Sequence, residues 1–161
     1  MRFINDYLGF ATKFKVLIEN NPLLNSNEAT KNLLVRFQKR DNEHKLYWSD
    51  IEDAPFFSSG PIEFCNGEKR IGYNETIINE TRLDETEQYA LIFHEIGHFL
   101  YPRQTQDKTS RIKIELLCDE FSRQILGSSV VINALEKIYP FVAEDKVADI
   151  MERILILKNK E

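Results

Sequence analysis

The chain has 161 residues, of which 42% are hydrophobic and 29% charged, the balance of an ordinary soluble globular protein rather than of a disordered one. Its net charge of −5, from 21 basic and 26 acidic residues, argues against direct binding to nucleic acid or to an anionic membrane surface. No apolar run approaches the length of a membrane span, and the N-terminus does not match a signal peptide. Cys65 and Cys118 form no C-x-x-C motif. We therefore expect one cytoplasmic domain over residues 1–161.

Residues 1–40 have the apolar spacing of helices. In "FINDYLGFATKFKVLIEN" the apolar residues recur on one helix face from Phe3 onward, and Pro22 ends the pattern. A second helix is predicted over "NSNEATKNLLVRFQKR", capped by Ser26 or Asn27. Its buried stripe would consist of Leu33, Leu34 and Phe37. This part contains no chemical motif and is predicted to be a helical scaffold.

Residues 44–79 are predicted to form a small antiparallel sheet of about three strands. The segments "HKLYWS", "IEFCNGEKRIGYN" and "TIIN" are rich in β-branched and aromatic residues and are interrupted by glycine, proline and asparagine. Asn66-Gly67 is the dipeptide expected in a tight hairpin turn. The intervening "DAPFFSSGP" is predicted to be a loop.

The rest of the chain is predicted to be helical. Asp84 with Glu87 has the pattern of a capping box, and the helix that starts there continues through the next apolar run and ends near Pro102. The next predicted helix is "DKTSRIKIELLCDEFSRQIL", followed by Gly127 as a C-terminal cap. These two helices together make up residues 84–127. Two C-terminal helices follow over 128–161. Helices, a small sheet and helices again indicate an α+β domain.

The first of these helices carries H-E-x-x-H. His94 and His98 are four residues apart, so both imidazoles lie on one helix face and can bind one Zn²⁺. Glu95 can then act as the general base that takes the proton from a water whose pKa the zinc has lowered. The alternative is a helix whose two histidines only form hydrogen bonds. Gly97 favours the metal site, because a glycine in mid-helix costs about 1 kcal/mol and is tolerated where another segment must pass close by.

A catalytic zinc site needs a third protein ligand, and the next helix offers one. Glu115 and Asp119 in "IELLCDEFS" are again four residues apart, on a face surrounded by apolar residues. Glu115 would be the third ligand, and Asp119 would accept a hydrogen bond from one histidine ring. The alternatives are a solvated acidic face and His44 as the rival ligand, although His44 has no partner at metal-ligand spacing.

The chain resembles the ImmA/IrrE family of zinc metallopeptidases in "TIINETRLDETEQYALIFHEIGHFLY" and "IELLCDEFSRQIL". The resemblance covers roughly residues 62–126 and implies a zincin-like helical core of the gluzincin type. It implies His94, His98 and Glu115 as zinc ligands, Glu95 as general base, and Asp119 as the acidic residue of the second motif. Leu117 and Cys118 replace the glutamate and alanine that the family usually has there. A redox role for Cys118 is the alternative to simple packing.

Members of the family characteristically cleave helix-turn-helix repressors of mobile elements or stress-response genes, so we expect a cytoplasmic endopeptidase that cuts one regulatory protein, with no direct nucleic acid or membrane partner. The alternatives are a non-catalytic, partner-binding module and the accessory half of a toxin–antitoxin-like gene pair. An extended substrate could add beside the predicted strand 76–79. The oxyanion could be stabilised by Tyr101, Tyr139, Arg123 or His44.

Overall fold

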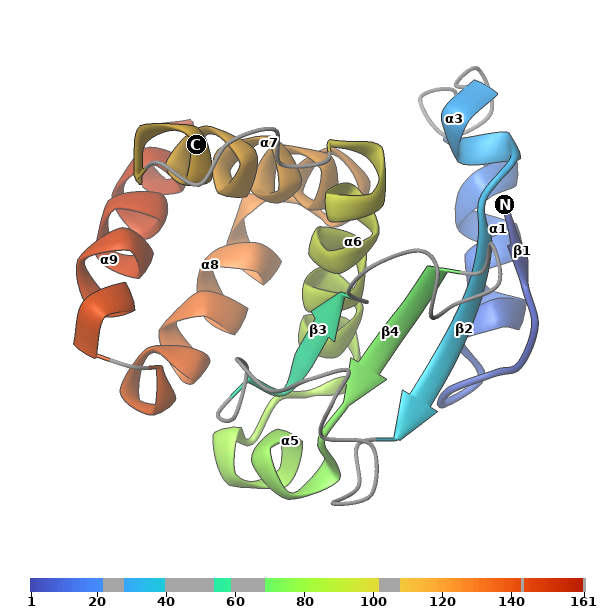
Figure 1. Cartoon of the computed structure of the whole chain (residues 1–161), viewed down its shortest axis with the longest axis horizontal. Coiled ribbons are helices and arrows are strands. Elements are labelled where there is room, and N and C mark those ends of the chain that lie inside the picture. Colours follow the sequence, from blue (N-terminus) through green and yellow to red (C-terminus); the bar gives the residue numbers. More distant parts are fainter. Residues whose placement is uncertain (22–27, 40–53, 59–68, 102–107, 143, 161) are drawn as a thin grey trace.

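The computed structural model describes residues 1–21, 28–39, 54–58, 69–101, 108–142 and 144–160, and combines helices with one small sheet (Figure 1). This agrees with the expected α+β class. The strands are β1 (Arg2–Phe3), β2 (Leu34–Lys39), β3 (Phe56–Ser58) and β4 (Lys69–Tyr73). The helices are α1 (Phe10–Glu19), α3 (Glu28–Lys31), α5 (Glu75–Thr81), α6 (Glu85–Leu100), α7 (Lys108–Leu126), α8 (Ser128–Ile138) and α9 (Glu144–Lys158), with a 3₁₀ turn at Tyr139–Phe141.

The sheet is mixed, and the prediction of an antiparallel sheet is wrong. Its strand order is β1-β2-β4-β3, in which β2 pairs in parallel with both β1 and β4, and only β3 runs antiparallel to its neighbour. Parallel neighbours require a long connection, and residues 40–68 between β2 and β4 provide one. The segment "HKLYWS" and the hairpin at Asn66-Gly67 lie outside the described residues.

The region 1–40 is only partly helical. Its first residues form β1 and a turn in which Leu8 and Gly9 have positive φ angles of 53° and 70°, so α1 begins only at Phe10. Strand β2 replaces the C-terminal part of the second predicted helix. In it Val35 and Phe37 are buried while their neighbours are more exposed, which is the period of a strand. A short apolar run fits both the helix period and the strand period, and pairing with β1 and β4 makes this run a strand.

Two secondary-structure predictions within residues 44–79 are wrong. Residues 76–79, predicted as a strand, belong to α5, because Asn74 caps that helix by accepting a hydrogen bond from the main-chain N–H of Ile77. Residues 56–58, predicted as part of a loop, form β3 beside β4. Residues 70–73, the C-terminal part of the predicted strand segment "IEFCNGEKRIGYN", are confirmed as the main part of β4. The sheet edge near the candidate site is therefore β3 and not residues 76–79.

The predicted helices of the C-terminal half are confirmed as α6, α7, α8 and α9. Helix α6 begins with the expected capping box, in which Asp84 accepts from the N–H of Glu87, and Glu87 accepts from the N–H of Asp84. Gly127, with φ of 94°, separates α7 from α8 in a conformation that favours glycine. None of the described helices is long and apolar enough to cross a membrane.

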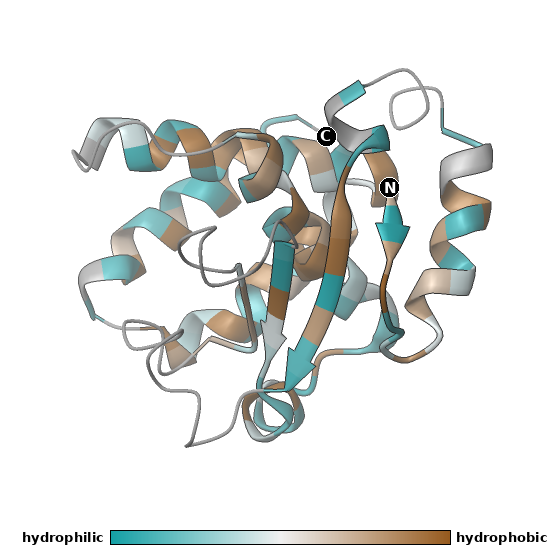
Figure 2. Ribbon diagram, turned by 45° about the vertical axis from the view of Figure 1, so that its right-hand side comes forward, coloured by the Kyte–Doolittle hydropathy of each residue, from teal (hydrophilic) through white to brown (hydrophobic). Residues whose placement is uncertain are grey.

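An aromatic core joins the sheet to α1 and α6. Phe10 and Phe14 of α1 lie with their ring centroids 5.5 and 5.4 Å from that of Phe93 on α6, and Phe10 also contacts Phe37 of β2. Hydrophobic and hydrophilic residues alternate along β2, as Figure 2 shows. Helix α6 thus packs against the sheet on one side and against α7 and α8 on the other. Because α6 is packed on both sides, the motion of its polar side chains is limited.

Candidate metal centre

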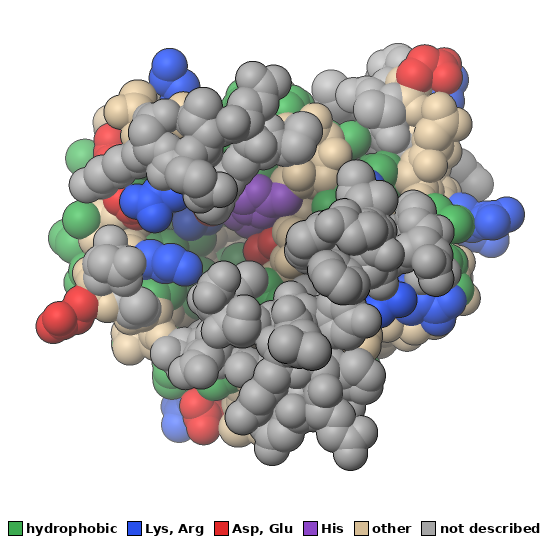
Figure 3. Space-filling view, in the orientation of Figure 1, with side chains coloured by type: hydrophobic (Ala, Val, Ile, Leu, Met, Phe, Trp, Pro, Cys, Tyr) green, Lys and Arg blue, Asp and Glu red, His purple; other side chains and the backbone are tan. Residues whose placement is uncertain are grey.

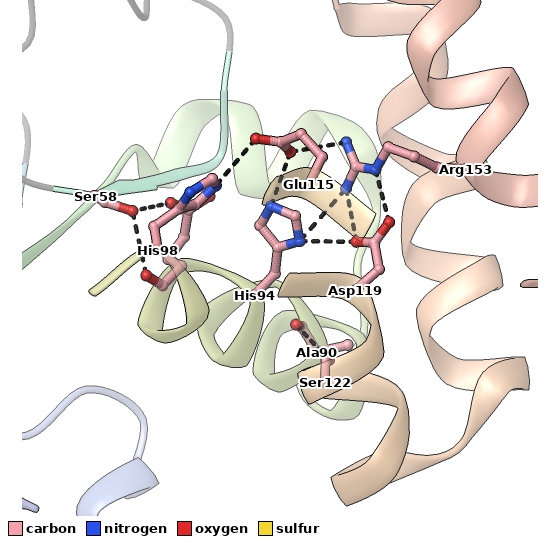
Figure 4. A network of polar contacts seen from close by, with 9 residues as sticks. Ser58, Ala90, His94, His98, Glu115, Asp119, Ser122 and Arg153 are labelled. Carbon is pink, nitrogen blue, oxygen red and sulfur yellow. Dashed lines mark hydrogen bonds and ion pairs between the residues drawn. The ribbon is translucent and has the colours of Figure 1, made fainter. Parts of the chain in front are cut away.

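Helices α6 and α7 bring three potential metal ligands together (Figure 4). His94 and His98 lie one turn apart on α6, with ring centroids separated by 4.9 Å. Glu115 of α7 faces both rings. Its Oε2 lies 3.0 Å from Nε2 of His94, and its Oε1 lies 3.1 Å from Nε2 of His98. Two imidazole nitrogens and a carboxylate are a donor set that catalytic zinc sites use, so these residues fit that metal.

The other nitrogen of His94 contacts Asp119, as the sequence predicts. Nδ1 lies 2.7 Å from Oδ1 of Asp119, and both side chains are buried. Burial raises the pKa of Asp119, but the charges of Arg153 and His94 outweigh it and lower the pKa. An ionised carboxylate can only accept a hydrogen bond, so Nδ1 carries a proton and donates a hydrogen bond to Oδ1 of Asp119. This contact fixes the orientation of the His94 ring and leaves Nε2 facing Glu115.

The two carboxylates also control the charge of His94. Burial lowers the pKa of His94, but Glu115 and Asp119 outweigh it and raise the pKa to about 10. Burial raises the pKa of Glu115, but the charge of His94 and hydrogen bonds from both histidines outweigh burial. The pKa of Glu115 therefore lies well below its usual range. Metals bind the neutral imidazole, so a metal at Nε2 would compete with a proton there.

Glu95 lies beside the histidines in the same pocket. This pocket has a volume of about 450 Å³ and is lined by His94, Glu95, His98 and Glu115, among others. The hydroxyl of Ser58, at the end of β3, hydrogen-bonds the Oε2 atom of Glu95 and lies 3.3 Å from its main-chain oxygen. In Figure 3 the purple histidine surface and a red carboxylate are visible within a hollow, with blue cationic side chains beside them.

Gly97 allows α6 and α7 to approach closely next to the site. A Cβ atom built on Gly97 would lie 3.0 Å from the Cα and 3.1 Å from the Sγ of Cys118. Nearby, the hydroxyl of Ser122 on α7 donates to the main-chain oxygen of Ala90 on α6, at 2.8 Å. The expectation that Gly97 makes room for a second segment therefore agrees with the packing, and that segment is the helix that carries Glu115.

Cys118 offers a second possible donor set. Ligand atoms of His94, His98 and Cys118 lie within 4.8 Å of one another. Cys118 is fully buried, however, and does not line the pocket, whereas Glu115 does. Burial, with the neighbouring carboxylates, also raises the pKa of the Cys118 thiol, and a metal binds the thiolate. We therefore favour Glu115 as the third ligand, and the burial of Cys118 favours a packing role over a redox role.

The residues considered for oxyanion stabilisation do not line this pocket where the structure describes them. Tyr101 packs against the hydrophobic core, and Tyr139 lines a separate pocket beside α9. Arg123 pairs with Glu120, with Nε 2.8 Å from a carboxylate oxygen. His44 lies outside the described residues.

Arg153 and Ser58 are site residues that the sequence analysis missed. Arg153 had a detectable signal, because it stands between Ile150 and Leu157 at helical spacing, on the apolar face of α9. An arginine at such a position indicates a buried ion pair. Ser58 had no signal, since its segment was predicted to be a loop.

Comparisons of the chain with family models, curated proteins and solved structures gave no match.

Proposed function

We propose that the protein is a zinc-dependent endopeptidase. One observation carries the proposal: two imidazoles of α6 and the carboxylate of Glu115 on α7 converge on the wall of a pocket that Glu95 also lines. His94, His98 and Glu115 would hold the metal. When bound, zinc would supply Lewis-acid activation of a water molecule and of the substrate carbonyl. The resemblance to the ImmA/IrrE family is consistent with this assignment and implies a zincin-like core.

In this proposal Glu95 moves the proton. Its Oε2 is held by the Ser58 hydroxyl, which leaves Oε1 to accept a proton from the attacking water and to deliver it to the leaving amine. Asp119 fixes the ring of His94 through Nδ1. Burial of His94 and Asp119 at the contact of α6 with α7 limits the motion of these two side chains, which favours a reproducible geometry at the site.

The proposed substrate is a regulatory protein in the cytoplasm, and specifically a helix-turn-helix repressor of a mobile element or stress-response gene. The family resemblance supports this choice of partner. The pocket has apolar as well as polar lining residues, since Phe56, Phe57 and Phe99 line it beside the histidines and carboxylates.

The decisive experiment uses Glu95→Gln. Wild type purified without chelator is expected to contain about one zinc per chain, because the three ligands form one site. The variant should keep the metal and the fold, since Glu95 is not a ligand. When each protein is co-expressed with a repressor encoded beside its gene, only wild type should cleave the repressor, because loss of a general base costs 10²–10⁴-fold.

Two results would contradict the proposal. A wild-type protein that takes up no zinc at micromolar concentration cannot be a zinc peptidase. Equal derepression by wild type and Glu95→Gln, with the repressor intact, would instead identify a non-catalytic binding module.

A further inference from the structure

Helix α9 contributes a buried arginine to the candidate metal centre. The side chain of Arg153 is 8% exposed and lines the same pocket as the two histidines. A buried guanidinium is costly unless its charge and its N–H groups find partners. Its partners are the two carboxylates on α7 that contact His94, as Figure 4 shows.

The contact with Asp119 is bidentate. Nε of Arg153 donates to Oδ2 at 2.7 Å, and Nη2 donates to Oδ1 at 2.8 Å. Two parallel hydrogen bonds between a planar guanidinium and a carboxylate fix the orientation of both groups. Oδ1 is also the atom that accepts from Nδ1 of His94. The plane of the Asp119 carboxylate, and with it the direction of the histidine ring, is therefore fixed from α9.

The contact with Glu115 is an ion pair. Nη1 of Arg153 lies 3.3 Å from Oε2, the oxygen that faces His94. Asp119 and Glu115 are neighbouring acidic groups in a buried region, and they repel each other unless a cation lies between them. Arg153 provides this cation, and its Nη2 also lies 3.5 Å from Nδ1 of His94 (Figure 4).

We infer that Arg153 is a positioning residue of the metal centre, and that α9 is thereby a functional part of the site. It holds Asp119 and Glu115 in the orientations that direct His94 and the carboxylate ligand toward one point. The inference rests on the metal centre proposed above. A purely structural alternative is that Arg153 only anchors α9 to α7.

Metal affinity, measured on the purified full chain, separates the two roles. Zn²⁺ would be titrated in competition with a chromophoric chelator, and Co²⁺ binding would be followed by its visible spectrum. Three variants are compared. Arg153→Met removes the charge and the hydrogen bonds, and Arg153→Lys keeps the charge without the bidentate fork. Leu157→Ala weakens the packing of the same buried face of α9 at a residue that does not line the pocket.

We expect Arg153→Met to bind Zn²⁺ 10–100-fold more weakly than wild type, which is the usual effect of removing a group that orients a ligand. Arg153→Lys should be intermediate, and its Co²⁺ spectrum should differ from that of wild type. Leu157→Ala should lower the melting temperature and leave metal affinity unchanged. Should Arg153→Met fail to fold, the affinity and spectrum of Arg153→Lys give the decision.

Wild-type affinity and spectrum in a folded Arg153 variant would overturn the inference and leave the proposed function standing. The same loss of affinity in Leu157→Ala as in Arg153→Met would also overturn it, since general loosening of α9 would then be the cause. A wild-type protein that binds neither metal would refute the proposed function and this inference together.

Discussion

Glu115 and Cys118 lie less than one turn apart on α7, yet they differ in what they can offer a metal. The Glu115 carboxylate faces the pocket and both imidazoles, whereas the Cys118 thiol is fully buried against Gly97. Carboxylates are ionised at neutral pH, but a thiol whose pKa is raised by burial is not. In the proposed metal centre, the environment of the two side chains therefore favours Glu115 over Cys118 as the ligand.

Substitutions test that choice. Glu115→Ala is expected to lower zinc affinity by orders of magnitude, because it removes one of three ligands, whereas Cys118→Ala and His44→Ala should bind normally. Asp119→Ala should fall between these, with a loss of about 10–100-fold. Competition titration with a chelator measures each affinity. A large loss in Cys118→Ala with normal binding by Glu115→Ala would mean that the thiol is the ligand.

Helices α6 and α7 approach closely beside the site, where Gly97 meets Cys118. We expect Gly97→Ala to destabilise the protein by about 1–3 kcal/mol, because its Cβ would lie 3.0 Å from a main-chain atom, and a gain of about 1 kcal/mol in helix propensity offsets only part of this. Urea denaturation measures the change. Because the clash includes the Cα of residue 118, adding Cys118→Ala should rescue it only partly. Full rescue would show that the thiol alone was in the way.

A surface ion-pair cluster ties α7 to the chain end that follows α9. The hydrogen bond from Arg123 is the main cause that lowers the pKa of Glu120 to about 2. Burial opposes this shift, and Lys160, whose Nζ lies 2.7 Å from the carboxylate, adds to it. A carboxyl whose pKa is lowered by folding stabilises the folded state above its unfolded pKa, near 4.5, and this contribution is lost as the pH falls towards 2.

The Glu120→Gln variant is therefore expected to be less stable than wild type at pH 7, by no more than about 1 kcal/mol because the cluster is partly exposed. The difference should shrink between pH 4.5 and pH 3. Urea denaturation of both proteins at pH 7, 4 and 3 tests this. A difference of the same size at every pH would contradict the assigned cause.

On the scale of the whole molecule, the candidate site joins three helices and the sheet. His94 and Glu95 come from α6, Glu115 and Asp119 from α7, and Arg153 from α9, while β3 contacts Glu95 through its last residue. A metal held by α6 and α7 would bind the folded chain far better than the unfolded chain. Its binding free energy would then add to the free energy of unfolding.

Zinc should consequently raise the melting temperature, and a chelator should reverse the effect. At a free zinc concentration 100 times the dissociation constant, the added stability is about 2.7 kcal/mol. Differential scanning calorimetry measures it, and His98→Ala, which lacks a ligand, serves as the control. An equal rise in the variant would indicate nonspecific binding of zinc.

The sequence by itself determined those features that depend on neighbours along the chain. Helix α6 was predictable because Asp84 and Glu87 form a capping box from residues three apart, and the spacing of His94 and His98 places both on one face whatever surrounds them. The same reasoning placed Glu115 and Asp119 on one face of α7. These are local consequences of helix geometry.

Only the tertiary structure decided what depends on partners far away in the sequence. Residues 34–39 fit a helix or a strand, and hydrogen bonding to β1 and β4 made them a strand. Parallel pairing cannot be read from the strand sequences alone, because it depends on the long connection between them. The pairing of Arg153 with Asp119 joins residues 34 positions apart. An arginine on an apolar helix face signals that a partner exists, but only the packing of α9 against α7 selects which carboxylate it is.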